Sequence, residues 1–428
     1  MMPRRPAPPP PASFCSKYAS RRSVLAHGLA LCAVPAAAPL AAQGFAGLGT
    51  EAAGYAIPDR SPLVFPGDHG AHPAFRIEWW YLTANLTDAA GRDLGLQWTL
   101  FRSALRPPDP EAAEAGWQAP QIWLAHAAVT TPERHVAAER FARGGVGQAG
   151  VHPAPFAAWL DEWRLAAPDA DLPMRAPASG TTRADGSERA ASGAGAAPGA
   201  PPAGAADGAR TAAAAGTTDG DALDRLVVVA SAEDFAYEVR LTAQGPLVLQ
   251  GESGYSVKSP EGQASRYYSQ PFYRAEGVLR LPEGEIAVTG RAWLDREWSS
   301  QPLADTQDGW DWISLHLDTG EKLMGFRLRD RARAPFTSAT HIAPDGTATP
   351  YSDGALTLTP LETARVAGRD VPVRWRAELP EQGIDVALSA VNPQAWMGLG
   401  FPYWEGPVRI EGSHAGRGYL EMTGYPEA

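Results

Sequence analysis

A short run near residue 295 carries the side chains best suited to chemistry. In an extended backbone every second residue points the same way, so the run 291–298 places on one face Arg291, Trp293, Asp295 and Glu297. The strand rise sets the two carboxyl groups about 7 Å apart. Burial of this face would raise the pKa of one carboxyl, which could then protonate an alkene or a leaving group near neutral pH while the second guides water. A hydratase or a hydrolase needs this geometry.

For two acid–base candidates, Asp295 and His126, the sequence also allows a purely structural role. Asp295 could instead be held in an ion pair by Arg291 or Arg296. A third acid–base candidate, His126, shares a strand face with three apolar residues, which is also typical of a hydrogen-bonded core histidine; they are Ile122, Leu124 and Ala128.

Other polar residues stand out from their apolar surroundings. Glu78 falls between Ile77 and Trp79, and a buried carboxylate there needs a partner such as Arg76 or Arg102. The Gly/Pro-rich segment before this strand contains further polar residues, which could lie at the rim of a site or simply form hydrogen bonds within a loop: Asp68, His69 and His72.

Several enzymatic signatures are missing from the sequence. It has no G-x-S-x-G elbow, no P-loop, no dinucleotide-binding glycine pattern and no H-E-x-x-H. A metal site would have to be assembled from scattered histidines and carboxylates. We therefore expect no obligatory cofactor and no metal.

Short strands must position these residues. Leucines and Trp98 alternate with smaller or polar residues over 94–100, and the same period of two recurs over 235–241, 286–288, 313–317, 371–375 and 384–388. Turn signals such as Asp318-Thr319-Gly320 separate several of these runs. The pattern predicts an all-β sandwich or barrel.

The N-terminus resembles an export signal. Five basic residues and no acidic ones precede or enter an apolar run over 24–40, and Ser20-Arg21-Arg22-Ser23-Val24-Leu25 is similar to a twin-arginine signal. His27, Pro35 and Pro39 interrupt the run, which argues against a membrane anchor. We expect a signal peptide over 1–42 and a periplasmic or secreted protein.

Composition limits the partners. Both cysteines, Cys15 and Cys32, lie in the predicted signal, so the mature chain would lack disulfides. Removing the five basic residues of the signal leaves 32 of 37 Lys and Arg against 48 Asp and Glu, a net charge of −16 that disfavours nucleic acid as a partner. The segment 176–221 has no aromatic residue and no Val, Ile, Leu or Met, which predicts a disordered insert.

Fourteen tryptophans, several of them clustered, carry a resemblance. The chain resembles the lipocalin-like group that includes the AttH proteins and the carotenoid 1,2-hydratases (hydroxyneurosporene synthases), also described as secreted hydrolases. The resemblance runs from about residue 65 to 425 and rests on motifs in the right order, among them Asp68-His69-Gly70, Glu78-Trp79-Trp80-Tyr81, Trp293 to Trp298, Gly309-Trp310-Asp311-Trp312, Tyr403-Trp404-Glu405-Gly406 and Gly416 to Glu421.

The resemblance implies two lipocalin-like antiparallel β-barrel domains, which we place at 60–270, with the insert, and at 271–428. Barrels of about eight strands can enclose one apolar ligand such as a lipid or isoprenoid. Aromatic residues that could contact it, or could equally fill the core, are Trp79, Tyr81, Trp98, Trp293, Trp298, Trp312 and Tyr268.

One departure from the resemblance concerns the acid motif. The carotenoid hydratases carry a motif similar to Asp-His-x-Trp, of which Asp295 and Trp298 match the ends, while Arg296 replaces the histidine. Arginine does not shuttle protons, so hydration of a carotenoid itself is not implied.

Three classes of function remain open from the sequence. The chain could bind an apolar molecule without chemistry, act on it as a hydratase or hydrolase, or serve an ABC transporter permease, because AttH-like proteins are encoded beside such permeases. Asp295 is the first choice for a catalytic acid.

Replacing Arg21 and Arg22 together by Lys should block export, because the twin-arginine receptor reads that pair. We expect precursor to accumulate in the cytoplasm, measured by immunoblotting of periplasmic and cytoplasmic fractions. Replacing Arg4 and Arg5 by Lys is the matched control and should leave export intact. Normal periplasmic yield of the Arg21/Arg22 variant would contradict the prediction.

Overall fold

β-strands dominate the computed structural model, with 61% strand and 2% helix, as the period-two pattern predicts. The structure describes residues 53–109, 119–170, 221–301, 303–304 and 306–427. The predicted signal (1–42) and the segment 176–221, apart from Asp221, lie outside these residues. Among the described residues the helical elements are two 3-10 turns, η1 (Gly67–His69) and η3 (Pro380–Gln382), and no helix is long and apolar enough to cross a membrane.

The first sheet contains thirteen strands in the order β4-β3-β2-β1-β13-β12-β9-β8-β7-β6-β5, with β10 and β11 pairing to β12. Its strands are β1 (Ile77–Asp88), β2 (Asp93–Ala104), β3 (Gln121–Thr130), β4 (His135–Arg143), β5 (Ala149–Pro153), β6 (Phe156–Leu160), β7 (Trp163–Ala166), β8 (Arg225–Ser231), β9 (Ala236–Ala243), β10 (Val248–Leu249), β11 (Tyr255–Val257), β12 (Ala264–Leu281) and β13 (Gly284–Ser299).

The second sheet contains ten strands in the order β17-β16-β15-β14-β23-β22-β20-β19-β18, with β21 pairing to β22. Its strands are β14 (Gln307–Leu317), β15 (Lys322–Asp330), β16 (Phe336–Ile342), β17 (Ala348–Tyr351), β18 (Thr357–Val366), β19 (Arg369–Leu379), β20 (Ile384–Ala390), β21 (Trp396–Met397), β22 (Tyr403–Gly412) and β23 (Gly416–Met422).

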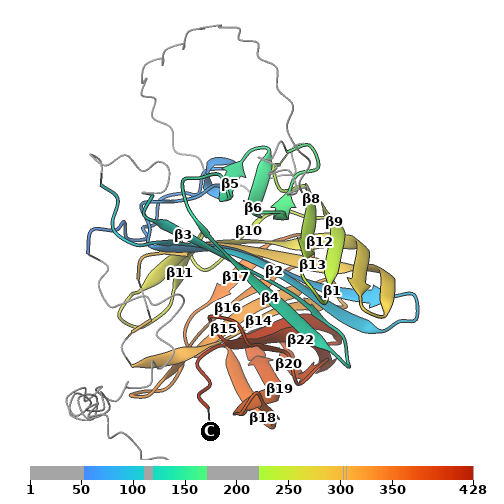
Figure 1. Cartoon of the computed structure of the whole chain (residues 1–428). Helices are drawn as coiled ribbons and strands as arrows, with labels where there is room; N and C mark the ends of the chain where they lie inside the picture. Colours follow the sequence, from blue (N-terminus) through green and yellow to red (C-terminus); the bar gives the residue numbers. More distant parts are fainter. Residues whose placement is uncertain (1–52, 110–118, 171–220, 302, 305, 428) are drawn as a thin grey trace, which may run out of the picture. The chain divides into compact units, whose positions relative to one another are not determined.

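Each sheet curls because its first strand pairs with its last. β1 pairs antiparallel with β13, and β14 pairs with β23, while most other neighbours follow one another in sequence. Each hydrogen-bonded path ends at two strands adjacent in sequence, β4 and β5 in the first sheet and β17 and β18 in the second. The result is one nearly closed barrel and one half-barrel, which confirms the predicted all-β class of two lipocalin-like antiparallel sheets (Figure 1).

The two sheets divide later in the chain than the boundary we placed at 270/271. That position falls inside β12, and both β12 and β13 belong to the first sheet because β13 closes it against β1. The sheets separate between Ser299 and Gln307. A period-two pattern shows that a strand exists but not which sheet it joins.

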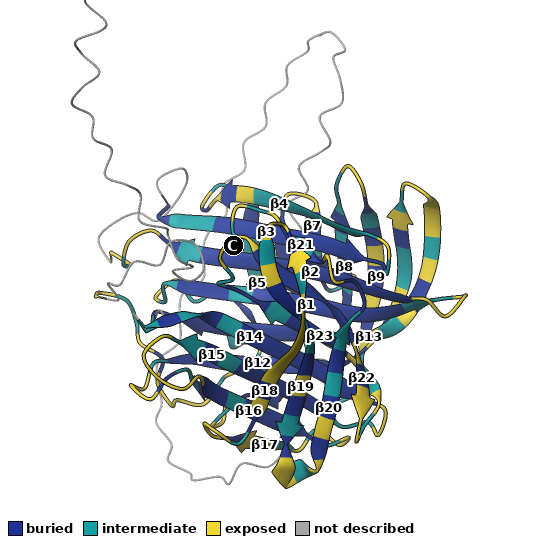
Figure 2. Cartoon of the chain, turned by 90° about the horizontal axis from the view of Figure 1, so that it is seen from below, coloured by how far each residue is buried: buried dark blue, intermediate teal, exposed yellow. Residues whose placement is uncertain are grey.

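Three buried clusters follow from the alternation of side chains. One fills the inside of the first sheet, one fills the inside of the second, and a third lies between the sheets. On β1, for example, Trp80 and Leu82 belong to the first cluster, while Tyr81 belongs to the third. The central strands are therefore buried on both faces, as the dark blue stretches of Figure 2 show. The candidate chemistry lies in this doubly buried region.

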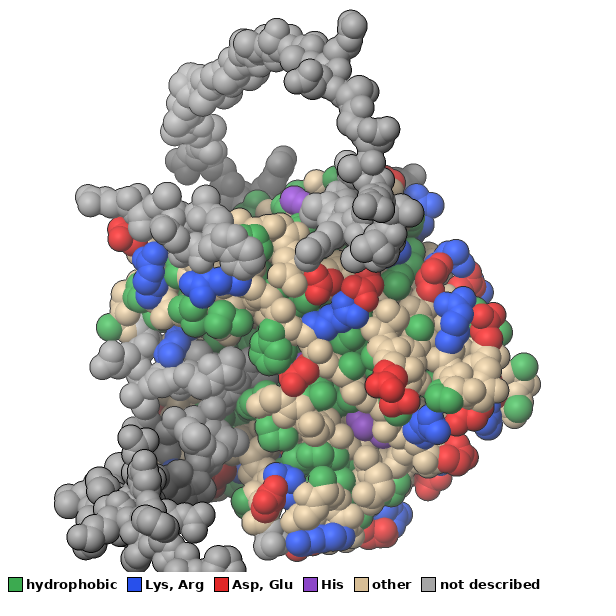
Figure 3. Space-filling model, in the orientation of Figure 1, with side chains coloured by type: hydrophobic (Ala, Val, Ile, Leu, Met, Phe, Trp, Pro, Cys, Tyr) green, Lys and Arg blue, Asp and Glu red, His purple; other side chains and the backbone are tan. Residues whose placement is uncertain are grey.

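The outside of the molecule is mixed in charge. On the face drawn in Figure 3, acidic and basic side chains of the described residues are interspersed and do not gather into an extended basic surface.

Candidate active site

A cavity with about 130 Å³ of free space lies between the two sheets. Its walls come from β1, β12 and β13 on one side and from β14, β15 and β23 on the other. Three of the predicted ligand-contacting residues line it, namely Trp79, Tyr81 and Trp312. Apolar walls with a few charged groups are typical of a small-molecule site.

Asp295 and Glu297 both point into this cavity, since they share one face of β13. The Asp295 carboxylate accepts hydrogen bonds from Trp293 Nε1 (2.7 Å), from the Tyr267 hydroxyl (2.8 Å) and from the Ser269 hydroxyl. Burial raises its pKa to about 7, although these donors favour the ionised form. Asp295 can therefore carry a proton at neutral pH and release it.

The ion-pair alternative for Asp295 does not match this arrangement. Arg296 points to the opposite face of β13 and pairs with Glu78. Among the described residues no arginine pairs with Asp295, whose partners are all neutral. Trp293, another predicted ligand residue, acts here as a donor to the acid rather than as part of the cavity lining.

Glu297 has a different environment from Asp295. Its Oε1 lies 2.8 Å from Lys258 Nζ and also accepts a hydrogen bond from the Ser265 hydroxyl. The two acids of the motif therefore differ in their partners: Glu297 has a lysine beside it, whereas the partners of Asp295 are neutral.

Two further acids of the interface were not among the residues predicted from sequence. Glu421 lines the cavity and accepts a hydrogen bond from Trp310 Nε1 (2.5 Å), and burial raises its pKa to about 7. Glu405 accepts one from the Tyr81 hydroxyl (2.5 Å), and burial raises its pKa well above the ordinary value. In the sequence each follows an apolar residue of a conspicuous motif, Trp404 and Leu420, and this acidic residue in an apolar run could have marked it as a candidate. Their proximity to β13 depends on how the two sheets pack.

Three predicted ligand residues face the inside of the first sheet instead. Trp98, Trp298 and Tyr268 belong to its core cluster. The ring of Trp298 stacks on His72 at 4.0 Å, and the Tyr268 hydroxyl lies 2.7 Å from His69 Nδ1. Each is adjacent in sequence to a residue that faces the space between the sheets. Because successive side chains of a strand point to opposite faces, each of the three points into the first sheet instead.

His126 also lies outside the cavity lining. It is fully buried, its Nδ1 lies 3.0 Å from the Tyr403 hydroxyl, and burial lowers its pKa to about 3. A neutral, hydrogen-bonded ring agrees with the core-histidine interpretation. Phe101, which lines the cavity, contacts the His126 ring edge-to-face at 5.3 Å.

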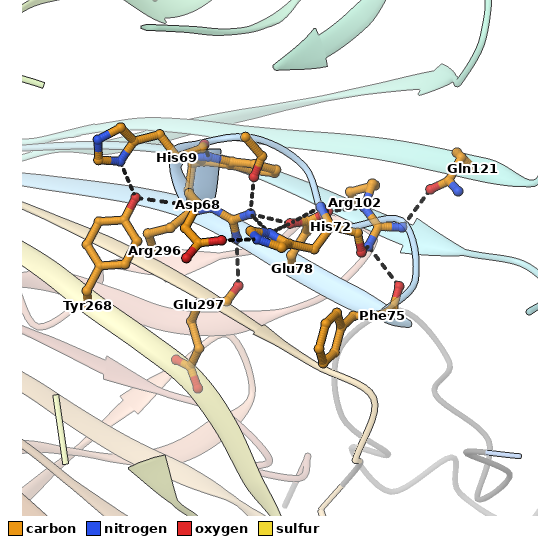
Figure 4. A network of polar contacts seen from close by, with 12 residues as sticks. Asp68, His69, His72, Phe75, Glu78, Arg102, Gln121, Tyr268, Arg296 and Glu297 are labelled. Atoms are coloured by element: carbon orange, nitrogen blue, oxygen red, sulfur yellow. Dashed lines mark hydrogen bonds and ion pairs between the residues drawn. The ribbon is translucent and has the colours of Figure 1, made fainter. Parts of the chain in front are cut away.

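A buried ionic network lies behind the cavity, on the other face of β1 and β13 (Figure 4). Glu78 is fully buried and pairs with Arg102 and with Arg296. Burial opposes ionisation of Glu78, but the two guanidinium groups hold its pKa well below the ordinary value. The Arg102 pairing is one of the two that the sequence predicted.

Two tryptophan rings also stabilise the Arg296 guanidinium through cation–π contacts. Its guanidinium lies 3.9 Å from the Trp80 ring centre and 4.7 Å from that of Trp298. His72 bridges the network to Asp68, at 3.0 Å from Nε2. The loop around η1 is thus tied to β13, and Arg296 is held away from the cavity.

No group of three or more His, Cys, Asp or Glu side chains is placed to hold a metal ion within the described part of the chain. The chemistry available in the cavity is that of carboxyl groups, one lysine and aromatic faces.

Glu78→Gln should destabilise the protein by about 3–5 kcal/mol, because it leaves two buried arginines without a carboxylate. Chemical denaturation measures the free energy of unfolding. Glu285→Gln is the matched control: its pair with Arg280 is exposed, so the loss should stay within about 1 kcal/mol. Equal losses in both variants would refute the structural role of the network.

Asp295→Asn should change how stability depends on pH. The folded pKa of Asp295 lies above its unfolded value, so the unfolded state releases this proton first and wild-type stability falls as pH rises from about 4 to about 7. The variant lacks this ionisation and should gain roughly 2–4 kcal/mol relative to wild type between pH 4 and pH 8, at about 1.4 kcal/mol per pKa unit. Denaturation at both pH values, with the exposed Asp370→Asn as control, measures the difference; a constant difference would mean an ordinary pKa for Asp295.

Comparison with known proteins agrees with the resemblance seen in the sequence. An AttH protein from Nitrosomonas europaea has a structure similar over 86% of this chain and 99% of its own, with 30% identity and a TM-score of 0.65. Kievitone hydratase from Nectria haematococca shares the fold over 86% of this chain and 95% of its own, with 12% identity and a TM-score of 0.55. No curated protein matched the sequence.

The family model described as AttH-like matches residues 56–188 and 188–425, which include both sheets and all the acids of the cavity. With the lipocalin-like fold and a similar AttH structure, this shows that the chain belongs to the AttH-like family.

Proposed function

We propose that this protein binds an apolar, unsaturated small molecule in the cavity between the sheets and catalyses the addition of water to it, or the reverse elimination, with Asp295 as the general acid. The observation that carries the proposal is a buried carboxyl with a pKa of about 7 in an aromatic cavity. A catalytic acid works best when its pKa lies near the working pH.

The reaction can be written with the residues of the cavity. Protonated Asp295 gives its proton to one carbon of a C=C bond, so a C–H bond forms and the other carbon becomes a cation. The faces of Trp79 and Trp312 stabilise that cation. Water adds to it through oxygen, and the extra proton of that oxygen passes to a carboxylate, either Glu297 or ionised Glu421. Return of this proton to Asp295 through solvent completes the cycle.

The exchange of histidine for Arg296 is compatible with this reaction. Arg296 lies on the face of β13 opposite to Asp295 and is bound to Glu78, so the acid and its three donors do not involve it. Kievitone hydratase, which shares the fold, is a hydratase by name. It supports the reaction type and leaves the substrate of this protein to experiment.

In this proposal the protein acts in the periplasm, as its N-terminal sequence indicates. The twin-arginine-like segment around Arg21 and Arg22 supports export of the folded protein to the periplasm.

Asp295→Asn should slow turnover strongly while leaving ligand binding largely intact. Apolar molecules are extracted from periplasmic protein, identified by mass spectrometry, and incubated with fresh protein in ¹⁸O-labelled water. Wild type should incorporate ¹⁸O, and Asp295→Asn should do so slower by a factor on the order of 10² or more.

His126→Gln is the matched control, because His126 is a buried titratable group outside the cavity lining, and it should keep most of the activity. If wild type contains stoichiometric ligand but incorporates no ¹⁸O, the hydratase proposal is wrong and the protein only binds its ligand.

A further inference from the structure

A second cavity lies at the other end of the space between the sheets, with about 730 Å³ of free space. The same strands line it further along their length: β13 contributes Arg291, β14 contributes His316, and β15 begins in it with Lys322. Arg274 and Arg417 also line it, and Asp318 is its one acidic lining residue. The first cavity is rich in carboxyl groups, whereas this one is rich in cations.

Lys322 is the most unusual of these cations. It is only 8% exposed, yet among the described residues no carboxylate pairs with it. Its Nζ donates to the Gly320 carbonyl (2.9 Å) and lies 3.7 Å from the centre of the Phe272 ring. Burial, with added repulsion from Arg291, lowers its pKa to about 8. Buried lysines are almost always paired, so this ammonium lacks a counter-ion.

Arg291 adds to the unbalanced charge. It lies directly opposite Arg274 across the β12–β13 pair, an arrangement of like charges that destabilises a sheet. Arg274 has a carboxylate partner in Glu276, at 2.8 Å. Arg291 is exposed, and its side chain has no hydrogen bond or ion pair to any residue that the structure describes, so its guanidinium is available to a ligand.

His316 provides a second, independent feature of a site. It is 3% exposed, and its Nε2 lies 3.0 Å from the Pro271 carbonyl, so Nε2 carries the proton and Nδ1 is an acceptor. Burial lowers the pKa of His316 to about 3, which keeps the ring neutral. Nδ1 is buried without a hydrogen-bond partner. A ligand with a hydroxyl group would supply the missing donor.

A packed layer separates the two cavities. Trp293, Met324 and Tyr419 are each at most 1% exposed and belong to the cluster between the sheets. Trp293 donates to Asp295 on one side and meets the ring of His316 edge-to-face at 5.7 Å on the other. Four residues of strand, about 13 Å, separate Arg291 from Asp295. A molecule in the second cavity therefore does not contact the acids of the first.

We propose that the second cavity binds a small hydroxylated oxyanion, such as a hydroxycarboxylate or hydrogen phosphate. Its oxygens bind Lys322 and Arg291, and its hydroxyl donates to Nδ1 of His316. Charge-assisted hydrogen bonds of this kind are the strong ones in proteins.

Isothermal titration calorimetry tests the site with citrate, tricarballylate and inorganic phosphate at constant ionic strength. Tricarballylate is citrate without the hydroxyl. We expect saturable binding of citrate or phosphate, and binding of citrate at least tenfold tighter than that of tricarballylate. Phosphate and citrate together distinguish the two kinds of oxyanion. No saturable binding of either would overturn the proposal, and equal affinity for citrate and tricarballylate would overturn the role of His316.

The double variant Arg291→Gln/Lys322→Gln should bind at least tenfold more weakly, while Arg240→Gln, at an exposed arginine on β9, should bind like wild type. Without ligand the double variant should melt at the same or a higher temperature, because like charges have been removed. A purely structural role of the two cations would lower the melting temperature and leave binding unchanged.

Lysine labelling of wild type keeps the proposal testable if the double variant does not fold. Lysine occurs only at positions 17, 258 and 322, so mature protein has one lysine at each cavity. Acetic anhydride labelling, followed by mass spectrometry, should be slowed at Lys322 by the bound anion and unchanged at Lys258. Equal effects on both lysines would overturn the assignment.

Discussion

Strand β13 is buried on both faces from Ala292 to Ser299, and this constraint governs the centre of the molecule. Burial withdraws the polar side chains there from bulk water, so they depend on partners within the protein. On one face, Arg296 is matched by the carboxylate of Glu78 and by two indole rings. On the other, Asp295 meets only neutral donors. The same strand therefore stabilises a charge on one side and leaves a proton exchangeable on the other.

The strands around β13 provide the partners and the packing that its buried side chains require. β1 supplies Glu78 to one face and Tyr81 to the other, and its pairing with β13 closes the first sheet. The second sheet then packs its aromatic outer face, with Trp312, onto β13 and β12. This packing removes water from Asp295 and raises its pKa. The fold and the chemistry of the cavity thus depend on a single doubly buried strand.

Sequence alone predicted the features that depend on local period. The β class, and the shared face of Asp295 and Glu297, follow from alternation along one strand. Which face meets which partner is a property of sheet packing, and here the prediction was incomplete. Tyr268 is predicted to contact a ligand but faces the core of the first sheet, whereas its neighbour Tyr267 lines the cavity, because a shift of one residue reverses the face. Glu421 reaches the cavity from a strand more than a hundred residues away. No local pattern contains that information.

The boundary between the sheets escaped prediction for the same reason. The closing partner of β1 is β13, about 200 residues along the chain, and turn signals give no indication of such a distant pairing. Motif resemblance predicted the lipocalin-like all-β class, but the boundary placed with its help fell inside β12. It also directed attention to Arg296, where the resemblance to the acid motif of the carotenoid hydratases fails. Only the structure shows that this departure lies on the face away from the acid.

A catalytic acid must be held in position and yet be able to give up its proton, and these demands usually conflict. An arginine partner would position Asp295 but would also stabilise the carboxylate and lower its pKa. Neutral donors position the carboxyl with less bias toward ionisation, so that burial decides the pKa. Glu78, on the opposite face of the sheet, shows the opposite case, because two arginines hold its pKa well below the ordinary value. The contrast between these two buried acids separates a structural carboxylate from one suited to catalysis.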